Sequence, residues 1–134
     1  MMHAARLTAV FALFALASCG AASPQELQAE PGTEVTVAPG EVVKISELKV
    51  RFIAVTEDSR CPRDTTCFWA GAVKVQLAID QPSQPLQQAE VEEGSNTVVG
   101  DYRVTVLRVQ PERTSETKIP PQDYRATLRV DEAV

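Results

Sequence analysis

The feature that most constrains this fold is a two-residue alternation of apolar and polar side chains, repeated in short runs between turn residues. The clearest runs are residues 72–79, 102–109 and 124–130, where valine, leucine, isoleucine and tyrosine largely alternate with polar side chains. Because successive side chains of a β-strand point to opposite faces of a sheet, these runs predict strands with one buried face. After the first eighteen residues, no stretch of ten shows the 3.6-residue period of an amphipathic helix. The pattern predicts an all-β domain.

Shorter runs raise the predicted number of strands to seven or eight, at residues 34–38, 41–45, 48–56, 86–92 and 97–99. Pro39-Gly40 predicts a type II turn, because proline fixes φ at the first corner and glycine accepts positive φ at the second; residues 41–45 follow as the return strand. A shift in the alternation near Ile53 predicts a bulge. Short antiparallel strands at this spacing predict one small β-sandwich over residues 34–132, with an immunoglobulin-like sandwich as first choice and a small barrel as second.

The first eighteen residues are predicted to be a signal peptide rather than part of the domain. A single basic side chain, Arg6, precedes the apolar run 7–17, which is shorter than the roughly 20 residues of a membrane-spanning helix. Leu16-Ala17-Ser18-Cys19 resembles the lipobox of bacterial lipoprotein signals. The resemblance implies cleavage before Cys19 and a membrane anchor of palmitate-type acyl chains on that cysteine. An ordinary secretory signal followed by a free cysteine is the alternative.

The lipobox resemblance also implies a location. In lipoproteins an aspartate after the lipidated cysteine favours retention at the inner membrane, and here that residue is Gly20. The resemblance therefore implies the outer membrane of a Gram-negative cell envelope, with the domain facing the periplasm. Residues 19–33 are mostly small or polar and contain prolines, so they are predicted to be the lipidated cysteine and a flexible tether.

Two cysteines remain beyond Cys19, and an even pair in an exported protein predicts a disulfide between Cys61 and Cys67. The surrounding sequence resembles a signature of small exported bacterial proteins, many of them lipoproteins, that runs Asp58-Ser59-Arg60-Cys61-Pro62, four residues, Cys67, one residue and Trp69-Ala70-Gly71. The resemblance implies export and a strand-rich fold, and it implies no activity.

Two interpretations of this cysteine-containing segment stay open. In the structural one, Asp58 forms an Asx turn with the backbone of Arg60. Trp69 then covers the disulfide or a sheet end, and Gly71 allows close approach of the backbone. In the other interpretation, the segment presents a recognition surface made of Arg60, Arg63, Asp64 and Trp69.

The composition excludes several classes of chemistry. The only histidine, His3, and both methionines leave with the signal, so the mature chain has no Ser-His-Asp or Cys-His nucleophile and lacks the usual zinc and copper ligands. Twelve basic and eighteen acidic side chains then remain, a net charge of −6, which disfavours nucleic acid and anionic lipid surfaces as partners. No cofactor and no metal are predicted, although a calcium site at Glu92, Glu93 and Asp101 is left open.

The sequence therefore favours a non-catalytic envelope lipoprotein. Such a protein is a binding or structural module with a membrane anchor, and its further partner is an envelope protein or a saccharide. Two alternatives come from other classes. A protease inhibitor would present Arg63 on the small disulfide ring to a trypsin-like enzyme. A small hydrolase would use the carboxylates of Asp58 and Asp64, which flank the ring.

Overall fold

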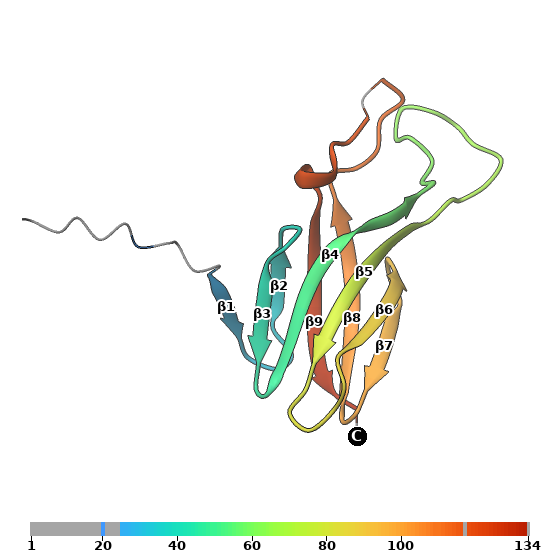
Figure 1. The fold of residues 1–134 in the computed structure, drawn as a ribbon. Coiled ribbons are helices and arrows are strands. Elements are labelled where there is room, and N and C mark those ends of the chain that lie inside the picture. Colours follow the sequence, from blue (N-terminus) through green and yellow to red (C-terminus); the bar gives the residue numbers. More distant parts are fainter. Residues whose placement is uncertain (1–19, 21–24, 117, 134) are drawn as a thin grey trace, which may run out of the picture.

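The strands predicted from the alternation form two packed sheets (Figure 1). The computed structural model describes residue 20, residues 25–116 and residues 118–133. The predicted signal peptide and Cys19 lie outside the described residues. Both sheets are open and, apart from one parallel strand pair, the pairing in the described chain is antiparallel. The predicted small all-β sandwich is confirmed.

The first sheet has five strands in the order β1-β3-β4-β5-β6. They are β1 (Glu26–Ala29), β3 (Val42–Ile45), β4 (Leu48–Asp58), β5 (Val73–Asp80) and β6 (Gln87–Glu92). The second sheet has the order β2-β9-β8-β7, formed by β2 (Glu34–Val37), β7 (Asn96–Val99), β8 (Tyr102–Gln110) and β9 (Arg125–Glu132). A short 3₁₀ turn, η1 (Pro121–Asp123), precedes β9. Strands β3 to β6 therefore form a meander, and the second sheet brings strands from both ends of the domain together.

The alternating apolar side chains fill the space between the two sheets, as predicted. In β5 the inward-facing side chains are at most 1% exposed, namely Val73, Val75, Leu77 and Ile79. They meet equally buried side chains of the second sheet, among them Val104, Val106, Ala126, Leu128 and Val130. Burial of one such aliphatic side chain contributes roughly 1.5–3 kcal/mol, so these two faces hold the sheets together.

The bulge predicted near Ile53 is present in β4. The register of β4 against β5 shifts between Phe52 and Ala54. Phe52 lies in the core, whereas the side chain of Ile53 is 37% exposed. Phe52 and Ile53 thus keep the ordinary alternation, and the shift in register instead brings Val55, three residues after Phe52, back against the core.

The turn at Pro39-Gly40 has the predicted type, but the strand after it does not pair with the strand before it. The N–H of Glu41 donates to the carbonyl of Ala38 at 3.0 Å, and Gly40 has φ of 89°. The strands on either side belong to different sheets, since β2 pairs with β9 and β3 pairs with β4. The interpretation of residues 41–45 as a return strand is therefore wrong: the turn carries the chain from the second sheet to the first.

Part of the predicted tether is a strand. Residues 26–29 form β1, which pairs in parallel with β3 at the edge of the first sheet. Leu27 and Ala29 pack against the core, and Glu26 forms a salt bridge with Lys49 at 3.1 Å. The prediction of a flexible tether is wrong for these residues. The pairing with β3, the packing of Leu27 and Ala29 against the core, and the salt bridge of Glu26 hold the segment to the sheet edge.

One end of the sandwich carries its longest connections. The segment 59–72 joins β4 to β5, and the segment 111–124 joins β8 to β9 (Figure 1). These two segments, here called the loop end, lie side by side, since the N–H of Arg63 donates to the carbonyl of Arg113 at 2.9 Å. The cysteine-containing segment is thus placed against a partner segment from the other sheet.

Candidate functional site at the loop end

The loop end is organised around an ion pair between Asp58, the last residue of β4, and Arg60. Nε and Nη2 of Arg60 each donate to the Asp58 carboxylate at 2.8 Å. The hydroxyl of Tyr124 donates to the same carboxylate, also at 2.8 Å. The backbone N–H of Arg60 donates to Oδ1 of Asp58 at 3.4 Å, so the predicted Asx turn is present with a long hydrogen bond. The two side chains are only 10% and 15% exposed, and the pair is therefore part of the interior of the loop end.

The Arg60 side chain connects the two sheets. Its Nη1 donates to the carbonyl of Val109 at 2.9 Å, and its Nη2 donates to that of Pro111 at 3.0 Å. Arg113 makes the reverse connection, since its Nη1 donates to the carbonyls of Asp58 and Arg60 at 3.3 and 3.1 Å. We call Asp58, Arg60, Arg113 and Tyr124 the loop-end network. It ties the end of β4 in the first sheet to the ends of β8 and β9 in the second.

The electrostatics of the network follow from its geometry. Burial works to raise the pKa of Asp58, but the hydrogen bonds from Arg60 and Tyr124, with the charge of Arg60, outweigh it and hold this pKa below its ordinary value of 3.8. The hydrogen bond to Asp58 raises the pKa of Arg60. Burial first, and then the hydrogen bond to Asp58, raises the pKa of Tyr124 to about 12. At neutral pH Asp58 is therefore a carboxylate, Arg60 a guanidinium and Tyr124 a neutral phenol.

The two ends of segment 59–72 are in close contact. The N–H of Ser59 donates to the carbonyl of Ala72 at 2.7 Å, and the N–H of Ala72 donates to Oγ of Ser59 at 3.0 Å. Gly71, the residue before Ala72, has φ of 69°. A Cβ atom on it would stand 2.0 Å from the carbonyl oxygen of Ser59. The close backbone approach predicted at Gly71 is therefore confirmed, and it closes the base of the segment.

The segment beyond this base carries the disulfide and all four predicted recognition residues. Cys61 and Cys67 are bonded, as predicted. Arg63 forms an exposed ion pair with Glu112 at 3.2 Å, and Asp64 accepts hydrogen bonds from the N–H and the hydroxyl of Ser115. These exposed contacts join the ring to the neighbouring segment 111–124, whereas the side chain of Arg60 is 15% exposed and is held mainly within the loop end.

Trp69 and its neighbour Phe68 project from the loop end. Trp69 is 65% exposed and Phe68 is fully exposed. With most of its surface exposed, Trp69 fits the interpretation as a presented side chain better than that of a cover over the disulfide or a sheet end. Sequence reasoning did not select Phe68, although two consecutive aromatic residues in an uncharged stretch were a visible signal. Exposed aromatic pairs of this kind mark contact surfaces more often than scattered single apolar side chains do.

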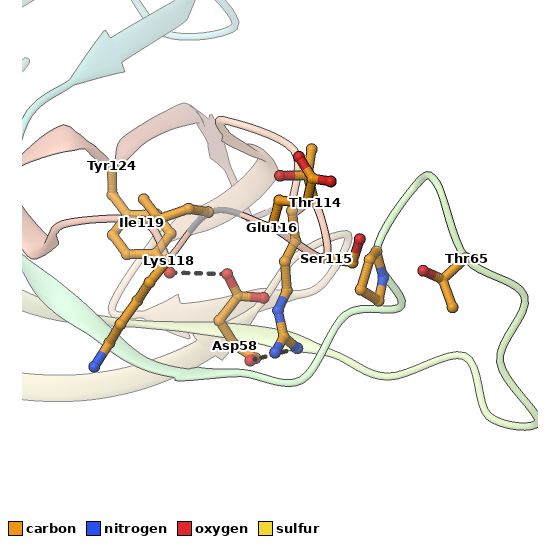
Figure 2. A pocket seen from close by; sticks show the side chains of 10 residues that line it. Asp58, Thr65, Thr114, Ser115, Glu116, Lys118, Ile119 and Tyr124 are labelled. Atoms are coloured by element: carbon orange, nitrogen blue, oxygen red, sulfur yellow. Dashed lines mark hydrogen bonds between the residues drawn. The ribbon is translucent and has the colours of Figure 1, made fainter.

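A cavity of about 730 Å³ lies between the two segments of the loop end (Figure 2). Figure 2 shows Tyr124 at one side of it, Asp58 in the middle and Thr65, from the disulfide ring, at the other side. Ile119 adds an apolar side chain to the lining, and Arg113 adds a cation. The Asp58 carboxylate within the cavity is already bound by Arg60 and Tyr124. The cavity is therefore lined by polar side chains, but this carboxylate is not free to react with a ligand.

The described part of the chain contains no group of three His, Cys, Asp or Glu side chains placed to hold a metal ion. The calcium site considered at Glu92, Glu93 and Asp101 is therefore not formed. Glu93 has another role, since its carboxylate accepts the N–H of Val109 at 2.7 Å. That contact adds a further link between the two sheets at the loop end.

Among the described residues there is no helix with the length and apolar character needed to span a bilayer. No protein-family model, no curated protein and no solved structure matches the chain. What the protein does must be inferred from the loop end itself.

Proposed function

We propose that this protein is a non-catalytic lipoprotein of the bacterial cell envelope whose sandwich presents the loop end as a contact surface. One observation carries the proposal: Phe68 and Trp69 are exposed on a segment whose base is fixed by Gly71 and by the loop-end network. Apolar side chains held out by a rigid scaffold gain from a partner that removes them from water, at little cost in ordering.

The proposal includes the lipid anchor and the cellular location that were inferred from the sequence. Acyl chains on Cys19 would attach the protein to the outer membrane, with the domain facing the periplasm. An envelope protein or a saccharide is the partner class expected from the sequence. The net charge of −6 left after removal of the signal argues against nucleic acid.

The state of the loop-end carboxylates supports a non-catalytic role. A general acid of a glycosidase needs a raised pKa, and the pKa of Asp58 is lowered. The pKa of Asp64 is also lowered, chiefly by the hydrogen bonds from Ser115. Both carboxylates hold segments of the loop end in place, and that is a structural task.

The geometry around Arg63 does not favour the protease-inhibitor alternative. The N–H of Thr65 donates to the carbonyl of Pro62 at 3.0 Å, which places Arg63 at the corner of a tight turn. A protease binds the residues around the cleaved bond in an extended conformation. Incubation with trypsin tests this directly: we expect cleavage without inhibition, and a stable inhibited complex would replace the present proposal.

Site-specific photocrosslinking in the native envelope tests the contact surface. A photoreactive side chain replaces Phe68 in one variant and Leu86 in the matched control, because Leu86 is also exposed and lies at the opposite end of the sandwich. We expect a defined adduct from position 68, whether with a protein, a saccharide or a lipid, and none of the same mass from position 86. Identical or absent adducts at both positions would contradict a contact surface at the loop end. Mass spectrometry of the mature N-terminus tests the acylation of Cys19 independently.

A further inference from the structure

We propose that the surface contacted by the loop end is the lipid bilayer that holds the Cys19 anchor, with Phe68 and Trp69 placed in its interfacial region. This inference rests on the proposed lipid anchor and names the partner of the same contact surface. Four observations carry it: the chemistry of the segment, its shape, the direction in which the chain approaches the anchor, and the local charge.

The segment that bears the two aromatic side chains has no charged side chain over residues 65–73, which read Thr-Thr-Cys-Phe-Trp-Ala-Gly-Ala-Val. Tryptophan is enriched at membrane interfaces, because its ring is apolar and its N–H still reaches polar headgroups. A phenylalanine beside it adds apolar surface, whose burial away from water is favourable. An uncharged segment with these two side chains fits entry into the interfacial region of a bilayer whose headgroups carry little net charge.

The shape of the segment also fits a soft partner. Phe68 is fully exposed and is not covered by neighbouring side chains, so its ring stands clear of the sandwich. A flat platform for a sugar ring would need an aromatic face supported by the surface beneath it. A projecting side chain on a fixed base can instead insert into a lipid interface without a matching pocket in the partner.

The strand register brings the anchor toward the same end of the molecule. Glu26 pairs with Val42, and Val42 pairs with Arg51, so β1 begins level with the fourth of the eleven residues of β4. Because β1 is parallel to β3 and β3 is antiparallel to β4, the chain before Glu26 extends from the strand end that points toward the loop end.

The chain between the anchor and β1 has the length to reach that level. Seven residues separate Arg51 from Asp58 along β4, a rise of about 23 Å at ~3.3 Å per residue. Seven residues also separate Cys19 from Glu26, and they span at most about 25 Å. When it is fully extended toward the loop end, this chain places Cys19 about level with Asp58, at the base of the loop end. A lipid on Cys19 can therefore hold the domain beside the membrane with the loop end turned toward the bilayer.

The charge distribution allows this approach. The two segments of the loop end together carry four basic side chains (Arg60, Arg63, Arg113, Lys118) and four acidic ones (Asp64, Glu112, Glu116, Asp123). These eight charges cancel, and Asp58 of the loop-end network brings the loop end to −1, whereas the mature chain has a net charge of −6. Most of the acidic surplus lies on the rest of the molecule, which a negatively charged membrane surface would repel.

Tethering makes even a weak insertion effective. An anchor that holds the domain within a few nanometres of the bilayer gives the loop an effective concentration in the millimolar range. Burial of one or two aromatic side chains would give only marginal membrane binding from solution. With the anchor in place the same contact is sufficient to orient the domain.

Trp69 is the only tryptophan of the chain and therefore reports on its own surroundings. The mature acylated protein is reconstituted in phosphatidylcholine vesicles with and without bromine atoms high on the acyl chains. We expect Trp69 emission to shift to shorter wavelength and to be quenched by the brominated lipid. The quenching should persist in high salt, because the contact is apolar rather than ionic. As a matched control, Trp69→Phe combined with Leu86→Trp moves the reporter to the opposite end, where we expect no quenching.

The outcomes separate the two proposals. Unquenched Trp69 in a protein that is acylated and vesicle-bound would overturn the bilayer contact and leave the envelope lipoprotein intact. Trp69 that is protected only in native envelope membranes, and not in pure lipid, would also overturn it in favour of a protein or saccharide partner. Absence of acylation on Cys19 would instead remove the proposed anchor, and the bilayer contact with it. Equal quenching at both reporter positions would overturn the assignment to the loop end.

Discussion

The carboxylate of Asp58 is the single group on which most of the loop end depends, because it binds Arg60 and Tyr124 at once. Exchange for the neutral amide in Asp58→Asn leaves the guanidinium of Arg60 mostly buried without its counter-ion. We expect the free energy of unfolding to fall by about 2–4 kcal/mol, as measured by urea denaturation. Asp80→Asn changes an exposed carboxylate at the other end of the first sheet and serves as the control. Equal effects of the two substitutions would show that the ion pair does not stabilise the fold.

The lowered pKa of Asp58 makes the same group a source of acid sensitivity. In the unfolded chain an aspartate has a pKa of about 3.9, and in the folded chain the pKa of Asp58 lies below its ordinary value. Its stabilising contribution is therefore fully present above about pH 4 and is lost as the pH falls through the folded pKa. Between about pH 5 and 2, urea midpoints should fall more steeply for the wild type than for Asp58→Asn, which does not titrate. Parallel curves would contradict this linkage.

Tyr124 provides a second titration at the alkaline end. The chain has two tyrosines, and burial together with the hydrogen bond to Asp58 raises the pKa of Tyr124 to about 12. Because the folded pKa is above that of the unfolded chain, which is about 10, this contribution to stability is present below pH 10 and is lost as the pH rises toward 12. A spectrophotometric titration of the folded protein should show a late tyrosinate phase that Tyr124→Phe removes. Persistence of that phase in the variant would contradict its assignment to Tyr124.

At the scale of an element, the segment 59–72 keeps its shape because its two ends meet at Gly71. In Gly71→Ala the new methyl group would collide with the carbonyl of Ser59 at 2.0 Å, and the backbone also has positive φ. Gly94→Ala is a matched control, since Gly94 has φ of 83° and open space where the Cβ would stand. We expect the control to lose about 1–2 kcal/mol from backbone strain alone, and Gly71→Ala to lose distinctly more. Thermal or urea unfolding of the two variants measures the difference, and equal losses would mean that the close approach is relieved at little cost.

The elements that sequence reasoning predicted are those whose cause is local. The alternation in residues 73–79 sets which face of β5 is buried, and Pro39-Gly40 sets a type II turn through the φ values of two residues. By contrast, β1 is only four residues long, two polar and two apolar, and its pairing with β3 makes it a strand.

The loop end was harder to predict because its contacts join distant parts of the chain. The disulfide between Cys61 and Cys67 could be predicted from the number of cysteines and from the predicted export. The close backbone approach at Gly71 could be predicted from its place before a strand. Arg60 was expected at the surface, since no local pattern shows that Val109 and Pro111, about fifty residues away, supply acceptors for it. Arg113 was not singled out for the same reason, although its side chain binds two carbonyls of the other segment.

At the scale of the whole molecule, the two sheets are joined at the loop end by the network, which does not include the disulfide. The ring between Cys61 and Cys67 encloses seven residues, and closing so small a ring stabilises a fold by about 2 kcal/mol at most. The sandwich beneath it has its own buried core and the contacts of Asp58, Arg60 and Tyr124. The order of the ring and the stability of the sandwich should therefore be separable.

The double variant Cys61→Ser, Cys67→Ser tests this separation with two measurements on one protein. Far-ultraviolet circular dichroism should show intact strands and an unfolding free energy lower by no more than about 2 kcal/mol. Trypsin should cleave after Arg63 faster than in the wild type, because the turn from Pro62 to Thr65 is then held only by hydrogen bonds. Loss of the strand signal in the absence of denaturant would show instead that the sandwich depends on the ring. Unchanged cleavage would show that the contacts of Asp64 with Ser115 already fix it. The expected result, a folded sandwich with a loosened ring, would mean that the disulfide serves the surface that the loop end presents rather than the core beneath it.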